Sequence, residues 1–300
     1  MKSSQSDTIT VHFSFFIHQR KGIAMLRKAY LEITNVCNLS CAFCPGTKRT
    51  ARFLTPGEFR QLAGKLRGHT EYLYFHLMGE PLLHPALQTL LEIAGEQKFK
   101  VMLTTNGTLL SERQGILLAS AALHKVNISL QSFEANVGGD LGTYLKGCTD
   151  FAAAAAKAGK LCEFRLWNRG GWETMNHTIR SGLAETFPEP WTPSRSGYRL
   201  AERVWLEPGD RFDWPDLSLP SLGERCFCYG LRDQIGVLCD GTVVPCCLDR
   251  EGAVALGNLF NEELSDILST DRARAIYDGF SRRRAIEPLC QRCGYARRFS

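Results

Sequence analysis

Short apolar runs alternate with segments of helical periodicity from Tyr30 to about residue 206. The runs predict six strands, at residues 30–34, 72–77, 101–105, 125–130, 163–167 and, least clearly, 203–206. Helices are predicted to begin near residues 55, 85, 111, 141 and 173. The first has a threonine cap at Thr55, a proline at Pro56 and a glutamate three residues after the cap at Glu58. These local signals fix where that helix starts.

Buried strands separated by helices predict an α/β fold, in which a parallel sheet has helices outside it. About six such units suggest a partial (β/α)6 barrel of the TIM type. In barrels of this kind the reactive groups gather at the carboxyl ends of the strands, because the loops between strand and helix open there. Functional residues are therefore expected just after each predicted strand.

Composition narrows the class of protein. The 300 residues are 44% hydrophobic, which is enough for one large domain with a small appendage. The net charge is only +5, and the basic residues are spread along the chain, so a solvated surface is favoured over a nucleic-acid contact and no nucleic-acid partner is expected. The twelve cysteines have no secretory peptide before them, which favours metal or cluster ligands over disulfides.

The N-terminal segment, residues 1–24, is predicted to be a disordered extension. Its short apolar stretch at residues 11–17 is followed, rather than preceded, by Arg20 and Lys21, so it resembles neither a signal peptide nor a membrane span. Met25 is an alternative start, since the patterned sequence begins just after it. We expect a cytoplasmic protein with no membrane partner.

A loop with three cysteines follows the first strand. Cys37, Cys41 and Cys44 can hold three irons of a cubane cluster and leave the fourth iron open to another ligand. They can equally supply three of the four ligands of a zinc site. The spacing, with Phe43 before the last cysteine, resembles the signature of the radical S-adenosylmethionine (SAM) superfamily. That resemblance implies a [4Fe–4S] cluster that binds SAM and cleaves it reductively, giving a radical that abstracts hydrogen from substrate.

Further motifs at strand ends support the same resemblance. Met78-Gly79-Glu80 is similar to the family's Gly-Gly-Glu, with the first glycine replaced, and implies a contact with the methionine amino group of SAM. The other residues that the resemblance assigns to SAM binding are Thr105 and Asn106 in a Thr-Asn-Gly turn, Ser129 for the ribose with Gln131 beside it, and Phe43 for the adenine. Taken singly, these residues also fit ordinary turns and strand ends.

Arg165 interrupts an apolar strand and must be paired if it is buried. The methionine carboxylate of SAM and an internal glutamate are equally good partners. For His76 a core or barrel-lining role is favoured over proton transfer. Cys148 and Cys162 lie far from other cysteines and are predicted to be packed thiols.

After the barrel, predicted at residues 25–190, a connector at 191–221 is rich in Pro, Trp, Gly and Asp and can include the last barrel strand. A second cysteine group follows in residues 222–300. It has a hairpin at 235–247 that turns at Asp240-Gly241, and a helix at about 262–280. Spacing alone also fits a four-cysteine zinc knuckle.

The second group resembles the Twitch domain, the shorter relative of the SPASM domain. The resemblance implies one auxiliary [4Fe–4S] cluster with the ligands Cys228, Cys246, Cys290 and Cys293. Cys226 can replace Cys228, and Cys247 can replace Cys246. The spacing leaves these two choices open.

Three functions are consistent with the sequence. The first is a radical SAM oxidoreductase or maturase that modifies a peptide or protein. The second is a dehydrogenase of the same superfamily that acts on a sugar, an alcohol or a cofactor precursor. The third, from another class, is a non-catalytic metal-binding protein. For the enzymes we expect oxygen sensitivity and an electron donor such as flavodoxin or ferredoxin.

Overall fold

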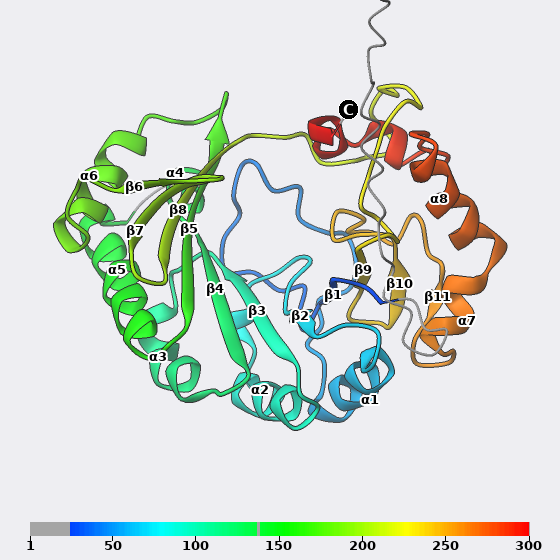
Figure 1. Cartoon of the computed structure of the whole chain (residues 1–300), viewed down its shortest axis with the longest axis horizontal. Coiled ribbons are helices and arrows are strands. Elements are labelled where there is room, and N and C mark those ends of the chain that lie inside the picture. The colour runs from blue at the N-terminus through cyan, green and yellow to red at the C-terminus, as the bar shows by residue number, and fades with distance from the viewer. Residues whose placement is uncertain (1–24, 137–138, 300) are drawn as a thin grey trace, which may run out of the picture.

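The computed structural model describes residues 25–136 and 139–299 (Figure 1). The predicted extension at residues 1–24 lies outside the described residues. The strands form one curved sheet, and most of the helices cover its outer face, as Figure 1 shows. This arrangement confirms the predicted α/β partial barrel.

The described strands form an eleven-stranded sheet in the order β11-β10-β9-β1-β2-β3-β4-β5-β8-β7-β6. Six neighbouring strands are parallel and make the barrel. Their bounds are β1 Lys28–Leu31, β2 Tyr72–Tyr74, β3 Lys100–Thr105, β4 Leu123–Ser129, β5 Leu161–Arg169 and β8 Val204–Asp210. The sixth strand thus lies in the connector, where the sequence predicted it least clearly.

Helices return the chain from each barrel strand to the next. They are α1 Pro56–Leu66, α2 Leu87–Glu96, α3 Leu110–Ala119, α4 Gln131–Glu134, α5 Leu141–Lys157 and α6 Asn176–Thr186, with a 3-10 turn η1 at Pro81–Leu83. Helix α1 has the predicted capping box, in which Glu58 N–H donates to Thr55 Oγ1 and the Glu58 carboxylate accepts from Thr55 N–H. Phe59, Phe75 and Phe164 are almost fully buried in the core.

The C-terminal part is continuous with the barrel sheet (Figure 1). Strand β9 (Gln234–Val237) runs parallel to β1, and Lys28 is in register with Gln234. This pairing explains why β1 begins two residues before the predicted strand, since its partner lies far along the sequence. Strands β10 (Thr242–Val244) and β11 (Gly257–Asn258) follow, and β9 and β10 form the predicted hairpin.

The single predicted helix at 262–280 is wrong, because the chain forms two helices there. Helix α7 covers Leu264–Ser269 and α8 covers Asp271–Ser281. Between them Thr270 leaves the helical conformation, and its hydroxyl accepts from Ala273 N–H as an N-cap. Two 3-10 turns complete the chain, η2 at Cys290–Arg292 and η3 at Tyr295–Phe299.

The connector contains a hairpin that the sequence did not predict. Strands β6 (Thr192–Ser194) and β7 (Gly197–Ala201) are antiparallel and extend the sheet beyond β8. All three residues of β6 are exposed and one is a proline, so no apolar alternation marks this strand. Within the described residues, no helix has the length and apolar character needed to cross a membrane.

Candidate functional site

A cavity of about 890 Å³ opens inside the barrel. Its wall contains every residue that the sequence assigned to SAM or to the SAM-binding cluster. These are Cys37, Cys41, Phe43, Cys44, Gly79, Glu80, Thr105, Asn106, Ser129, Gln131 and Arg165. They come from five segments of the chain, on or after each of the first five barrel strands. The curved sheet therefore brings them to one space, as the rule for strand ends predicts.

The three-cysteine loop is held in a fixed turn between β1 and α1. Cys44 N–H donates to the Cys41 carbonyl at 2.9 Å. Cys37 is exposed and the other two cysteines are half-buried. Ala42 N–H donates to the Ala135 carbonyl at 3.2 Å, which ties the loop to the segment just after α4.

Two asparagines that the sequence did not single out tether this loop. The Asn136 amide donates to Cys41 Sγ at 3.1 Å and accepts from Ser40 N–H at 3.0 Å. Asn38, inside the cysteine run, accepts from the Asn106 amide at 2.9 Å. Such hydrogen bonds to cluster sulfurs and to their loop tune iron–sulfur sites. For Asn38, its position between two of the cysteines was a sequence signal for this role. For Asn136 the sequence contained no such signal.

Gly79 is required by close backbone packing. Its φ is +76°, and a Cβ there would lie 2.6 Å from the Thr34 carbonyl oxygen and 2.8 Å from that of Val36. The next residue, Glu80, donates its N–H to the Val36 carbonyl at 2.8 Å. The segment after β2 thus supports the start of the cysteine loop, and a side chain at position 79 would separate them.

The Glu80 carboxylate joins the ends of two strands. It is 2% exposed, and its oxygens accept from Asn106 N–H at 2.7 Å and from Leu82 N–H at 3.0 Å. Burial raises the pKa of this carboxyl to about 7, although these hydrogen bonds oppose the shift. Glu80 therefore positions the Asn106 turn as well as facing the cavity.

The end of β4 presents polar groups to the cavity. Ser129 and Gln131 both line it. The Oε1 of Gln131 is buried and has no hydrogen-bond partner among the described residues. A buried acceptor without a donor is costly, so a hydroxyl or N–H of a bound ligand fits here.

Arg165 has an internal glutamate as its partner, one of the two alternatives predicted. Its Nε lies 2.9 Å from Glu163, which also pairs with Lys125 at 2.6 Å. Burial alone would raise the pKa of Glu163, but Arg165 and Lys125 hold it below its ordinary value. Burial and the charge of Glu163 raise the pKa of Glu207, which lies 3.7 Å from Arg165. The guanidinium still faces the cavity and stacks over Trp167 at 4.6 Å.

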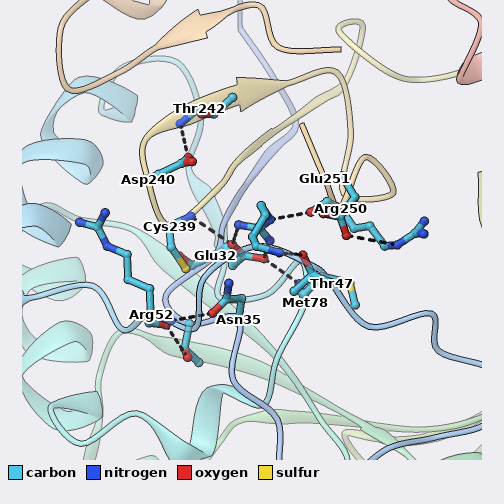
Figure 2. A network of polar contacts seen from close by, with 12 residues as sticks. Glu32, Asn35, Thr47, Arg52, Met78, Cys239, Asp240, Thr242, Arg250 and Glu251 are labelled. Carbon is cyan, nitrogen blue, oxygen red and sulfur yellow. Dashed lines mark hydrogen bonds and ion pairs between the residues drawn. The ribbon is translucent and has the colours of Figure 1, made fainter. Parts of the chain in front are cut away.

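Glu32 is the centre of a buried polar network (Figure 2). It is fully buried after β1 and accepts two hydrogen bonds from the Arg49 guanidinium, at 2.7 and 2.6 Å. It also accepts from Met78 N–H at 3.2 Å and from Cys239 N–H at 3.1 Å. No sequence motif predicts this role. One carboxylate thereby connects the end of the cysteine loop, the segment after β2 and the β9–β10 turn.

The second cysteine group surrounds a small cavity of about 30 Å³, and three of the cysteines around it also line the barrel cavity. The cysteines on its wall are Cys228, Cys246, Cys290 and Cys293. Cys226 and Cys247 do not line it: Cys226 Sγ faces the Phe227 carbonyl at 3.4 Å, and Cys247 faces the barrel cavity. Gly230 N–H donates to Cys228 Sγ at 3.4 Å. This placement supports the predicted ligand set over either replacement.

Burial raises the pKa of the thiols in both groups. It reaches about 11 at Cys41 and Cys293 and about 12 at Cys228, so the free thiols are protonated at neutral pH. Metal ligation requires thiolates, so cluster assembly must release these protons. In the part of the chain that the structure describes, no three His, Cys, Asp or Glu side chains surround one point that could hold a single ion. Ligands of a cubane need not do so, because each binds a different iron.

The remaining candidates are placed as follows. His76 lines the barrel cavity, and burial lowers its pKa to about 3, so the ring is neutral. Cys148 and Cys162 are fully buried in the core and are packed thiols, as predicted.

Comparison with protein families identifies the two parts. The radical SAM superfamily model matches residues 31–154, and the SPASM model, an iron–sulfur cluster-binding domain, matches residues 226–294. The chain thus carries a radical SAM domain and, C-terminal to it, a SPASM domain. These domains imply a SAM-binding [4Fe–4S] cluster, SAM and an auxiliary [4Fe–4S] cluster. The three cysteines on the barrel cavity and the four on the small cavity fit these groups.

Curated relatives match part of the chain. A GTP 3',8-cyclase of Synechococcus sp. (strain CC9605) is 28% identical over 192 residues, which is 60% of this chain and 48% of that protein. An S-adenosylmethionine-dependent nucleotide dehydratase of Selenomonas ruminantium is 32% identical over 88 residues, 29% of this chain and 32% of that protein. The chain spans about half or less of these two relatives.

Solved structures share the fold at low identity. BtrN in complex with AdoMet and 2-DOIA has a TM-score of 0.58 at 17% identity, covering 90% of this chain and 94% of that one. Streptococcus suis SuiB bound to the precursor peptide SuiA has a TM-score of 0.58 at 18% identity, covering 91% and 70%. These likenesses support the barrel and its C-terminal domain.

Proposed function

We propose that this radical SAM protein cleaves SAM reductively and removes a hydrogen atom from a substrate bound in the barrel cavity. When bound, the cluster on Cys37, Cys41 and Cys44 supplies the electron that breaks a carbon–sulfur bond of SAM. The observation that carries the proposal is that both cysteine groups reach the same 890 Å³ cavity. Its wall includes Cys228, Cys246, Cys247 and Cys293 together with the three-cysteine loop.

The side chains of the cavity wall position SAM and exclude water. Gly79 and Glu80 hold the strand ends against the cysteine loop, and Gln131 offers an unpaired acceptor. Aromatic residues also line the cavity, among them Trp167, Phe212 and Trp214. Exclusion of water protects a reactive radical from side reactions. The proposal also includes net oxidation of the substrate, and a flavodoxin or ferredoxin as the electron donor to the protein.

Two substrate classes follow from the comparisons. SuiB with its precursor peptide, and anSMEcpe with a bound peptide, support a peptide substrate. Relatives named GTP 3',8-cyclase and nucleotide dehydratase support a small molecule. The small-molecule class is favoured because Lys28, a lysine without an ion-pair partner among the described residues, lies on the cavity wall.

The test is anaerobic reconstitution with iron and sulfide, followed by dithionite and SAM, and measurement of 5′-deoxyadenosine. Wild-type protein is expected to form it, and Cys41→Ala to form none. Cys162→Ala removes a thiol that lies in the core away from the cavity and serves as the matched control, with formation retained. Reconstituted wild-type protein that carries its clusters and forms no 5′-deoxyadenosine would favour the non-catalytic alternative.

A further inference from the structure

Lys28 places an unpaired positive charge in the cavity wall. Its ammonium lies 5.3 Å from the ring centre of Tyr30 and 5.2 Å from that of Tyr74. Among the described residues it has neither an ion pair within 4.0 Å nor a hydrogen bond. The rings stabilise the cation but leave its three N–H donors unused. A half-buried ammonium with unused donors is ready for an anionic partner.

His76 adds a second unsatisfied group at the same place. Its ring lies 5.2 Å from Tyr30 and 5.8 Å from Tyr74, and its Nδ1 is buried with no partner among the described residues. A neutral imidazole has one donor and one acceptor nitrogen. A buried polar atom without a partner is unfavourable, and a ligand in the cavity would supply that partner.

The charges of the residues that line the cavity also favour an anionic ligand. Four cations line it, namely Arg27, Lys28, Arg165 and Arg211, against two carboxylates, Glu80 and Asp233. Three of the cations already have carboxylate partners: Arg27 with Asp233, Arg165 with Glu163, and Arg211 with Asp213. Lys28 is the cation left over, so the cavity has a positive excess that attracts anions.

We propose that Lys28, Tyr74 and His76 form an anion subsite, and that the substrate is a small molecule carrying a carboxylate or a phosphate. This inference rests on the proposed function and specifies its substrate. Lys28 begins β1, whereas Gly79 and Glu80 lie beyond the end of β2. The anionic end of the substrate therefore lies deep in the barrel, and its reacting carbon points toward the SAM residues at the strand ends.

The test compares anions with uncharged analogues on the reconstituted, SAM-loaded enzyme under anaerobic conditions. The pairs are GTP with guanosine, glucose 6-phosphate with glucose, and succinate with succinamide, and binding is followed by calorimetry. At least one anion is expected to bind saturably and more tightly than its neutral analogue. Lys28→Met, which keeps the apolar stem on the tyrosine rings, should weaken that anion at least about tenfold, and Lys28→Arg should retain most of the affinity.

Lys100→Met is the matched control. Lys100 also begins a barrel strand and lies over a tyrosine ring, 5.3 Å from Tyr72, but it pairs with Glu71 and does not line the cavity. It should leave anion binding unchanged. The proposal is overturned if no anion binds wild type better than its neutral analogue, or if Lys28→Met binds the anion as wild type does. Circular dichroism of each variant excludes misfolding as the cause.

Failure of this proposal is distinct from failure of the proposed function. Formation of 5′-deoxyadenosine by the wild-type preparation tests the SAM chemistry independently of the anion. A preparation that binds the anion through Lys28 and forms no 5′-deoxyadenosine would support the anion subsite and contradict the proposed SAM cleavage. A preparation that forms 5′-deoxyadenosine and does not bind the anion through Lys28 would support SAM cleavage and contradict the anion subsite.

Discussion

The two cysteine groups of this chain differ in how the fold assembles them. Cys37, Cys41 and Cys44 lie within one loop, are partly exposed and are tethered by polar side chains such as Asn136. The auxiliary cysteines come from three separate segments of the chain and meet around a small cavity. The first group is a local motif that leaves one iron open, whereas the second is a complete ligand set that exists only when the C-terminal part is folded.

Glu32 makes these two regions one structure. Its carboxylate accepts from Met78 N–H beside the SAM residues and from Cys239 N–H in the turn of the auxiliary hairpin. Strand β9 also pairs directly with β1. A substitution at one cysteine group is therefore expected to leave the other group unaffected only if it does not disturb the hydrogen bonds of Glu32.

The largest expected effect is loss of one cluster by a single substitution. Cys246→Ser should abolish the auxiliary cluster and halve the iron content, while 5′-deoxyadenosine formation persists. Cys247→Ser should keep both clusters, because Cys247 faces the barrel cavity rather than the small one. Iron analysis and electron paramagnetic resonance of the reduced proteins distinguish the two. Loss of the auxiliary signal in Cys247→Ser, with its retention in Cys246→Ser, would reverse the ligand assignment.

The next effect concerns the network that joins the regions. Glu32→Ala strands the Arg49 guanidinium, whose side chain is 14% exposed, and two backbone N–H groups. Removing one partner of a buried ion pair costs about 3–5 kcal/mol of unfolding free energy. Arg49→Met should cost less, because the carboxylate keeps its two N–H donors. Denaturant unfolding of the cluster-free protein measures both.

The control for this pair is Glu71→Ala, which breaks the exposed ion pair with Lys100. Its side chains are 70% and 51% exposed, and the pair spans 3.7 Å. Exposed pairs contribute about 1 kcal/mol or less. Equal costs for Glu32→Ala and Glu71→Ala would show that the buried network does not hold the two regions together.

The sequence predicts what depends on local signals and misses what depends on distant partners. The barrel strands and the cap of α1 follow from apolar runs and from Thr55 and Glu58, which are neighbours in the chain. Strand β6 has no buried side chain, and β1 is extended by Gln234, some two hundred residues away. Spacing could not decide between Cys246 and Cys247, because adjacent residues differ only in the direction that the fold gives them.

The same reasoning explains the polar residues that were missed. No local sequence pattern distinguishes Glu32 or Asn136 from other polar residues of the chain. Their roles arise when Cys239 and Cys41 are brought beside them, 207 and 95 positions away. Motifs therefore identify the groups that touch a cofactor, and the structure is needed to find the groups that hold those motifs in place.

The smallest expected effect tests whether the tether of the cysteine loop acts on its cluster alone. Asn136→Ala removes the N–H donor to Cys41 Sγ at 3.1 Å. A hydrogen bond to a ligand sulfur favours the reduced cluster, so its loss should lower the potential of the SAM-binding cluster by less than about 60 mV, a tenfold change for one electron. Potentiometry followed by paramagnetic resonance measures both clusters. Asn258→Ala, in the auxiliary part and without a cysteine contact, is the control. An equal shift of both clusters in Asn136→Ala would mean that the tether acts through the shared sheet, and the contrast between the two regions would fail.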